Sequence, residues 1–166
     1  MKIRIAGIVE DSIVDGEGLR ITVFTQGCPH NCPGCHNQST HPFTGGRDAD
    51  TAEILSLIDA NPLLDGITFS GGEPFLQPSP LTKLAREAHA RGLDVWSYTG
   101  YTLEELTAKK NPAIDSLLKE IDVLVDGRYE EKQRDLTLNF RGSANQRIID
   151  MNAYRKTGKI KTLISS

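Results

Sequence analysis

Residues 19–37 read LRITVFTQGCPHNCPGCHN, a strand pattern that runs directly into a loop holding all three cysteines of the 166-residue chain. Residues 19–24 are rich in apolar and β-branched types, as a buried strand requires. Pro29, Pro33 and Gly34 disfavour a helix in the segment that follows. In α/β proteins, ligands bind beyond the carboxyl ends of the strands. The junction therefore predicts a ligand-binding loop at the end of a strand.

Outward from this junction, apolar runs of strand length alternate with segments of helical period. Strands are predicted at residues 66–70, 93–98 and 121–125, with 146–150 as a candidate for the last. Helices are predicted at residues 78–91 and after the capping signals at 50–53, 102–105 and 111–112. Four or five βα units are too few for a closed barrel of about 250 residues. We therefore expect an α/β fold, an open partial (βα) barrel of mainly parallel strands.

No repeat, low-complexity tract or linker divides the sequence, so residues 1–166 are expected to form a single domain. Unusual loops follow four of the predicted strands, and these are the cysteine loop, Gly71-Gly72-Glu73, Thr99-Gly100 and Asp126-Gly127. The carboxyl ends of parallel strands meet at one edge of a sheet. We therefore expect these loops to share one site.

Composition narrows the class of function. The net charge of −3 and the pI near 5.8 provide no basic surface for nucleic acid. The first apolar run is short and is broken by Glu10 and Asp11, which fits neither a signal peptide nor a membrane span. A cytoplasmic protein is therefore expected, without nucleic acid or membrane as a partner. Disulfides are rare in that compartment, so three clustered thiols indicate metal binding or redox chemistry.

The number of cysteines discriminates between kinds of metal centre. A structural zinc site takes four ligands, usually as two separated pairs, and the chain has no second pair. His30 or His36 would complete a Cys3His zinc site only with strained geometry, and three unrelated buried thiols would not gather in one loop. An iron–sulfur cluster usually takes four cysteines, so three would leave one iron open to a substrate.

The C-x3-C-x2-C spacing of Cys28, Cys32 and Cys35 resembles the cluster motif of radical S-adenosylmethionine enzymes. The resemblance implies a 4Fe-4S cluster with one open iron, which the amino and carboxylate groups of S-adenosyl-L-methionine chelate. It also implies that the reduced cluster splits this cofactor into methionine and a 5′-deoxyadenosyl radical. The protein then has to position the cofactor and exclude competing reactions.

A second motif, Ser70-Gly71-Gly72-Glu73-Pro74, follows a predicted strand and reads by itself as a strand-to-helix turn. Glycines here allow the backbone to approach a ligand closely. The motif resembles the GGE motif of the same family, which implies that the backbone of Gly71 and Gly72 and the acid of Glu73 contact the methionyl amino group.

Further cofactor contacts follow from the same resemblance. Gly34, Cys35 and His36 occupy the place where the cluster loop of the family runs along the adenine, although Gly34 replaces the aromatic residue often found there. Ser97 and Thr99, with Gly100, are candidates for the methionyl carboxylate or ribose, and equally for turn residues. Trp96 and Tyr98 are interpreted as packing residues.

Four stretches carry a closer resemblance, and these are residues 14–20, 26–37, 122–128 and 139–149. Together they resemble the glycyl-radical activases of anaerobic ribonucleoside-triphosphate reductases. The resemblance implies abstraction of the α-hydrogen from one glycine of the large reductase subunit, with an electron donor such as a flavodoxin. The alternatives are an activase of another glycyl-radical enzyme, such as pyruvate formate-lyase, and a non-enzymatic zinc or electron-transfer protein.

An activase of this kind needs an open face that admits a loop of its partner protein. The candidates for lining that face or the cofactor site are Asp15, Arg20, Arg128, Arg141, Asn145 and Arg147. Each of them is equally well interpreted as solvated surface charge.

Overall fold

The computed structural model describes residues 1–30, 45–135, 140–141 and 143–163. The strands are β1 (Lys2–Ser12), β2 (Arg20–Thr25), β3 (Arg47–Asp50), β4 (Gly66–Gly71), β5 (Asp94–Tyr98), β6 (Val123–Asp126) and β7 (Arg147–Asp150). The helices are α1 (Thr51–Asp59), α2 (Pro78–Ala90), α3 (Leu103–Ala108), α4 (Pro112–Glu120) and α5 (Met151–Thr157), with short 3-10 turns η2 (Pro74–Leu76) and η3 (Glu131–Gln133).

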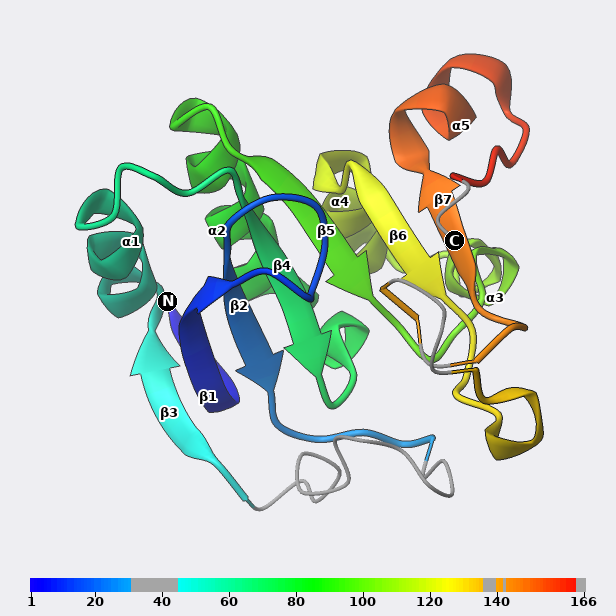
Figure 1. Ribbon diagram of the computed structural model, residues 1–166, viewed down its shortest axis with the longest axis horizontal. Helices are drawn as coiled ribbons and strands as arrows, with labels where there is room; N and C mark the ends of the chain where they lie inside the picture. Colours follow the sequence, from blue (N-terminus) through cyan, green and yellow to red (C-terminus); the bar gives the residue numbers. More distant parts are fainter. Residues whose placement is uncertain (31–44, 136–139, 142, 164–166) are drawn as a thin grey trace.

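In the described residues the strands form one sheet in the order β3-β1-β2-β4-β5-β6-β7 (Figure 1). The strands β2, β4, β5 and β6 pair in parallel, whereas β1, β3 and β7 pair antiparallel to their neighbours. The predicted α/β class and mainly parallel sheet are confirmed. The sheet ends at β3 and β7 rather than closing on itself, and its curvature as a partial barrel stays a prediction.

Most elements begin where the local signals place them. Thr102 and Glu105 form the predicted capping box of α3, and Asn111 caps α4 by accepting from the backbone N–H groups at the helix start. Asp50 caps α1, but Glu53 pairs with Arg47 instead of returning to the cap. Asp50 accepts from the N–H of Ala52, so α1 has an N-cap but not the reciprocal pair with Glu53.

The antiparallel strands β1 and β3 were not predicted. Their sequence signals are less plain than those of the parallel strands, because β1 runs through Gly7 into Glu10 and Asp11 and β3 reads Arg-Asp-Ala-Asp. β3 occupies the sheet edge, where charged side chains protect an exposed strand from pairing with other chains. Partners distant in the sequence, rather than local propensity, hold these two strands.

The main core lies between the sheet and the helices α1, α2 and α4, and Figure 1 shows α2 and α4 behind the sheet. Its members include Val23, Phe69, Leu84, Leu117 and Leu124. Successive side chains on a strand point to opposite faces. The other face of the sheet therefore carries a second, smaller cluster built on Trp96, Val125 and Ile148.

The loop that joins β1 to β2 crosses in front of this second face in Figure 1. Asp15 fastens the loop there, because its carboxylate accepts from Ser12 Oγ and Thr22 Oγ1 at 2.5 and 3.1 Å, and its backbone carbonyl accepts from Thr68 Oγ1 at 2.7 Å. Burial, with the charge of Asp15 second, raises the pKa of Tyr98 on the same face. We call this second face of the sheet the open face. The loop covers it over the amino-terminal half of the strands and leaves the half at their carboxyl ends for the site.

Candidate functional site

The start of the cysteine loop lies directly against the Gly71-Gly72-Glu73 turn. The backbone N–H of Gly72 donates to the carbonyl of Thr25 at 2.8 Å, and the N–H of Glu73 donates to the carbonyl of Gly27 at 2.7 Å. A Cβ atom on Gly72 would lie 2.8 Å from the backbone carbon of Gly27, so only glycine fits at this contact. The two predicted loops are thus brought together at the carboxyl ends of β2 and β4.

Glu73 is completely buried, and its carboxylate is a centre of hydrogen bonds. Oε1 forms a hydrogen bond of 2.7 Å with His30 Nε2, and it accepts from the backbone N–H of Gly100 at 2.8 Å and from Thr99 Oγ1 at 3.0 Å. Oε2 accepts from Thr99 Oγ1 at 2.9 Å and from the backbone N–H of Phe75 at 3.1 Å. Buried carboxylates persist in folded proteins when such donors replace water.

The geometry changes the role expected for the acid. With both oxygens of Glu73 engaged by the protein, a direct contact to a cofactor ammonium would require some of these bonds to break. Gly71 and Gly72 are partly exposed at the same edge, and their backbone stays the part of the predicted motif that a ligand can approach. Gly71 also has φ +91°, a conformation that favours glycine.

The predicted residues of β5 separate into two groups. Thr99 joins the site, because its hydroxyl binds Glu73 and accepts from the N–H of Tyr101 at 3.1 Å. Ser97 does not join it, since its side chain is fully buried and donates to the carbonyl of Tyr98 at 3.1 Å. Ser97 pairs in register with Phe69 and so shares the face that the helices cover.

His30 belongs to the site, although the sequence suggested it only as a zinc ligand. Its side chain is 4% exposed, and its ring meets the Tyr101 ring edge to face, with centroids 4.5 Å apart and an angle of 78°. Burial, with the charge of Glu73 second, raises the pKa of Tyr101. The signal that could have found His30 was its place between two cysteines, in the loop that follows β2.

Cys28 is the one predicted metal ligand within the described residues, and it is half-buried. Cys32, Cys35, Gly34 and His36 lie outside the described residues, so their predicted roles stay predictions. Cys28 is the third residue after β2 and is adjacent to Gly27, whose carbonyl holds the Glu73 turn. Soft thiolates at this position fit an iron–sulfur cluster.

A second polar network joins the ends of β6 and β7 to the start of α3. Arg147 binds the buried carboxylate of Asp126 at 2.9 and 2.5 Å and the exposed carboxylate of Glu104 at 2.6 and 3.3 Å. The carboxylate of Asp126 also accepts from the backbone N–H of Leu103 at 2.8 Å. Hydrogen bonds to Arg147 lower the pKa of Glu104, and those to Asp126 and Glu104 raise the pKa of Arg147.

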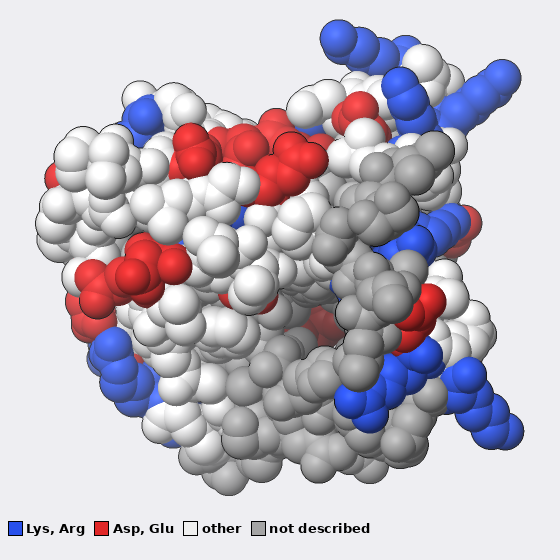
Figure 2. All heavy atoms as spheres, viewed as in Figure 1, with Lys and Arg blue, Asp and Glu red and all other residues white. Residues whose placement is uncertain are grey.

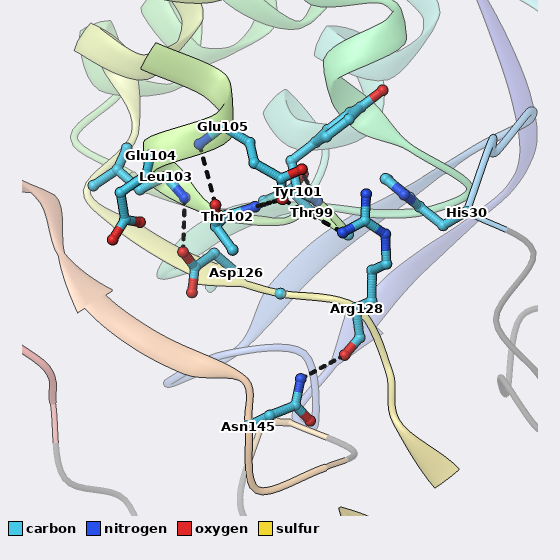
Figure 3. A network of polar contacts seen from close by, with 12 residues as sticks. His30, Thr99, Tyr101, Thr102, Leu103, Glu104, Glu105, Asp126, Arg128 and Asn145 are labelled. Atoms are coloured by element: carbon cyan, nitrogen blue, oxygen red, sulfur yellow. Dashed lines mark hydrogen bonds and ion pairs between the residues drawn. The ribbon is translucent and has the colours of Figure 1, made fainter. Parts of the chain in front are cut away.

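Figure 3 shows Arg128 reaching from the end of β6 toward His30 and Tyr101. Its guanidinium is 46% exposed and makes a long ion pair of 3.4 Å with Glu105. The Asn145 side chain donates to the Arg128 carbonyl at 2.8 Å and so holds the backbone of this residue. Arg128 is therefore a cation on the site edge with capacity for another anion.

Two of the other charged candidates serve the fold instead. Arg20 is fully buried at the amino end of β2, opposite the cysteine loop, and it does not line the predicted cofactor site. Arg141 turns back on its own loop and donates to the carbonyl of Gln146 at 2.7 Å.

The surface around the open face is hollowed near its centre, and charges are unevenly distributed over it (Figure 2). Figure 2 shows Lys and Arg side chains over the segment that joins β6 to β7; its exposed cations include Arg128, Lys132 and Arg134. Within the described ranges, no helix combines the length and apolarity that crossing a bilayer would demand.

Comparison with known proteins identifies the family. Residues 14–149 match the model of a 4Fe-4S single cluster domain. The anaerobic ribonucleoside-triphosphate reductase-activating protein of Pasteurella multocida is 41% identical over 151 residues, which cover 86% of this chain and 94% of that protein. This chain belongs to the family of anaerobic ribonucleoside-triphosphate reductase-activating proteins.

Other members of this family match over similar lengths. The protein from Salmonella typhimurium is 40% identical over 145 residues, covering 81% of this chain and 90% of that protein. The protein from Enterobacteria phage T4 is 33% identical over 141 residues, covering 81% and 86%. Among solved structures, QueE from Escherichia coli aligns with 61% of this chain and 54% of that chain, with a TM-score of 0.48 and 19% identity.

Proposed function

We propose that this chain activates an anaerobic ribonucleoside-triphosphate reductase by installing a glycyl radical in its large subunit. The observation that carries the proposal is the near-full-length identity to activating proteins, 41% over 86% of this chain in one case. The match to a 4Fe-4S domain includes Cys28 and the Gly71-Gly72-Glu73 turn, and the turn binds the backbone of Gly27, the residue before Cys28. The proposed enzyme is an oxidoreductase of the cytoplasm.

In this proposal Cys28, Cys32 and Cys35 hold the cluster, and S-adenosylmethionine binds at the iron that lacks a thiolate. When bound, the cluster supplies the electron for reductive cleavage of S-adenosylmethionine, with an electron donor such as a flavodoxin upstream. The backbone of Gly71 and Gly72 receives the methionyl amino group, because these residues can approach a ligand without side chains.

We assign Arg128 to the methionyl carboxylate. Its planar guanidinium suits a carboxylate, and the 3.4 Å pair with Glu105 is long enough to be exchanged for a closer partner. The open face of the sheet, the concave side of the proposed partial barrel, receives the glycine loop of the reductase. Its hollowed surface in Figure 2 is consistent with entry of a chain segment.

Anaerobic electron paramagnetic resonance tests the proposal. The reconstituted protein is incubated with dithionite, S-adenosylmethionine and the large reductase subunit. A glycyl-radical doublet is expected, together with stoichiometric 5′-deoxyadenosine and methionine. A Cys28→Ala variant, in which the cluster loses a thiolate ligand, is expected to give neither the doublet nor cleavage.

The choice of target has its own control. A parallel incubation contains pyruvate formate-lyase in place of the reductase. A doublet that appears only with pyruvate formate-lyase would assign the chain to another glycyl-radical enzyme. Zinc in place of iron in the purified protein, with no cleavage after full reconstitution, would remove the radical mechanism altogether.

A further inference from the structure

His30 makes several contacts with the protein, and a cluster held by three cysteines would not need them. Its ring is almost fully buried, its Nε2 lies 2.7 Å from Glu73 Oε1, and it makes an edge-to-face contact with the Tyr101 ring. That nitrogen is engaged with Glu73, so it is not a ligand for a metal.

The partners of His30 come from different strands. Glu73 follows β4, Gly100 and Tyr101 follow β5, and the Tyr101 carbonyl accepts from the N–H of Gly127 after β6 at 2.9 Å. His30 itself lies two residues after Cys28. The position of this imidazole therefore depends on three neighbouring strand ends, and the segment that carries Cys28 is attached to the imidazole.

We propose that His30 is a positioning residue that sets the relation between the cysteine segment and the Gly71-Gly72-Glu73 turn. This inference rests on the proposed function, because it concerns the same cluster and cofactor. His30 binds Glu73, and the Glu73 N–H binds Gly27, so the two loops are joined at both the side chain and the backbone. Groups that orient metal ligands without touching the metal commonly change affinity or activity about 10- to 100-fold when removed.

Gly100 forms the other wall of the His30 site. A Cβ atom on Gly100 would lie 2.6 Å from His30 Nε2 and 2.8 Å from its Cγ. Gly100 is not among the glycines with positive φ, so alanine meets no backbone strain there. Gly100→Ala therefore displaces the imidazole without altering either motif, and the displacement disappears when the imidazole is absent.

The test is a double-mutant cycle on the reconstituted protein under anaerobic conditions. The variants are His30→Ala, Gly100→Ala, both together, and His30→Gln, whose amide can still donate to Glu73. Gly7→Ala is the matched control, because a Cβ atom on Gly7 has no atom within 4 Å. The first measurement is the rate at which an iron chelator removes the cluster. The second is the S-adenosylmethionine concentration that half-converts the electron paramagnetic resonance spectrum of the reduced cluster.

Both single alanine variants are expected to release iron faster and to require about 10- to 100-fold more S-adenosylmethionine. The double variant should be no worse than His30→Ala, because the clash of the added methyl group needs the imidazole. His30→Gln should recover part of the loss, and Gly7→Ala should behave as the wild type. Melting curves confirm that the compared variants are folded.

Two results would overturn the proposal. One is a His30→Ala protein that matches the wild type in both measurements. The other is a double variant whose losses multiply, which would mean that Gly100 acts independently of His30. A wild-type cluster that never responds to S-adenosylmethionine would reject the proposed function instead, and iron release would still decide the role of His30.

Discussion

Replacing Arg20 with Met removes a guanidinium that is fully buried at the amino ends of the strands. Its bonds reach Thr68 Oγ1 at 2.7 Å, the Glu17 carbonyl at 2.7 Å, the Ile67 carbonyl at 3.0 Å and the Asp94 carboxylate at 2.5 Å. Methionine keeps most of the side-chain volume but offers no donor. We therefore expect a loss of stability rather than a loss of chemistry.

The magnitude follows from what is left behind. Removing one partner of a buried ion pair costs about 3–5 kcal/mol. The carboxylate of Asp94 is 48% exposed and stays partly hydrated, which favours the lower end, about 3 kcal/mol. A domain of this size loses about 2–4 °C of melting temperature per kcal/mol, so the expected decrease is about 6–12 °C.

The assay is thermal unfolding of the anaerobically reconstituted protein, followed by far-ultraviolet circular dichroism. Arg47→Met is the matched control, because Arg47 is exposed and its ion pair among the described residues is with Glu53 on the surface. Its melting temperature should stay within experimental error of the wild type. Cleavage of S-adenosylmethionine per folded molecule is measured in parallel and should be unchanged in both variants.

Two results would refute the reasoning. If Arg20→Met melts with the wild type, the buried contacts contribute no net stability. If it melts normally but no longer cleaves S-adenosylmethionine, Arg20 acts in the chemistry despite its place at the opposite end of the sheet.

Three further predictions concern the site and its edge. Gly72→Ala should lower stability by about 1–3 kcal/mol and weaken cofactor binding, because the added methyl overlaps the cysteine-loop backbone; a urea titration beside a binding titration checks this, and unchanged curves would contradict it. Arg128→Met should raise KM for S-adenosylmethionine about tenfold, as expected for a lost charge-assisted hydrogen bond, and an unaltered KM for 5′-deoxyadenosine formation would remove it from the carboxylate site. Because Arg147 lowers the pKa of Glu104 below its ordinary 4.5, this carboxylate stabilises the fold above that pH and ceases to do so as the pH falls through the lowered value. Melting temperatures should therefore fall less steeply below pH 4.5 in Arg147→Gln than in the wild type, whereas parallel curves would exclude the contribution.

The helices and parallel strands were predictable because their signals are local. A cap such as Asn111 acts on N–H groups two and three residues away, and an apolar period shows within a single turn. The pairing of β1 with β3 has no such local signal, because it joins residues 2–5 to residues 47–50. The sequence could not indicate a partner more than forty residues away.

The same division holds for the site. The sequence by itself indicated the kind of centre, since three closely spaced thiols predict iron–sulfur binding, and the match to a 4Fe-4S single cluster domain agrees with that prediction. Only the tertiary structure decided that Glu73 binds His30, Thr99 and Gly100 within the protein, and that Arg20 lies at the far end of the sheet. Residue identity indicates which kind of ligand a loop can bind. The groups that lie beside a buried charge depend instead on which strand ends meet in space, and this is a property of the tertiary structure.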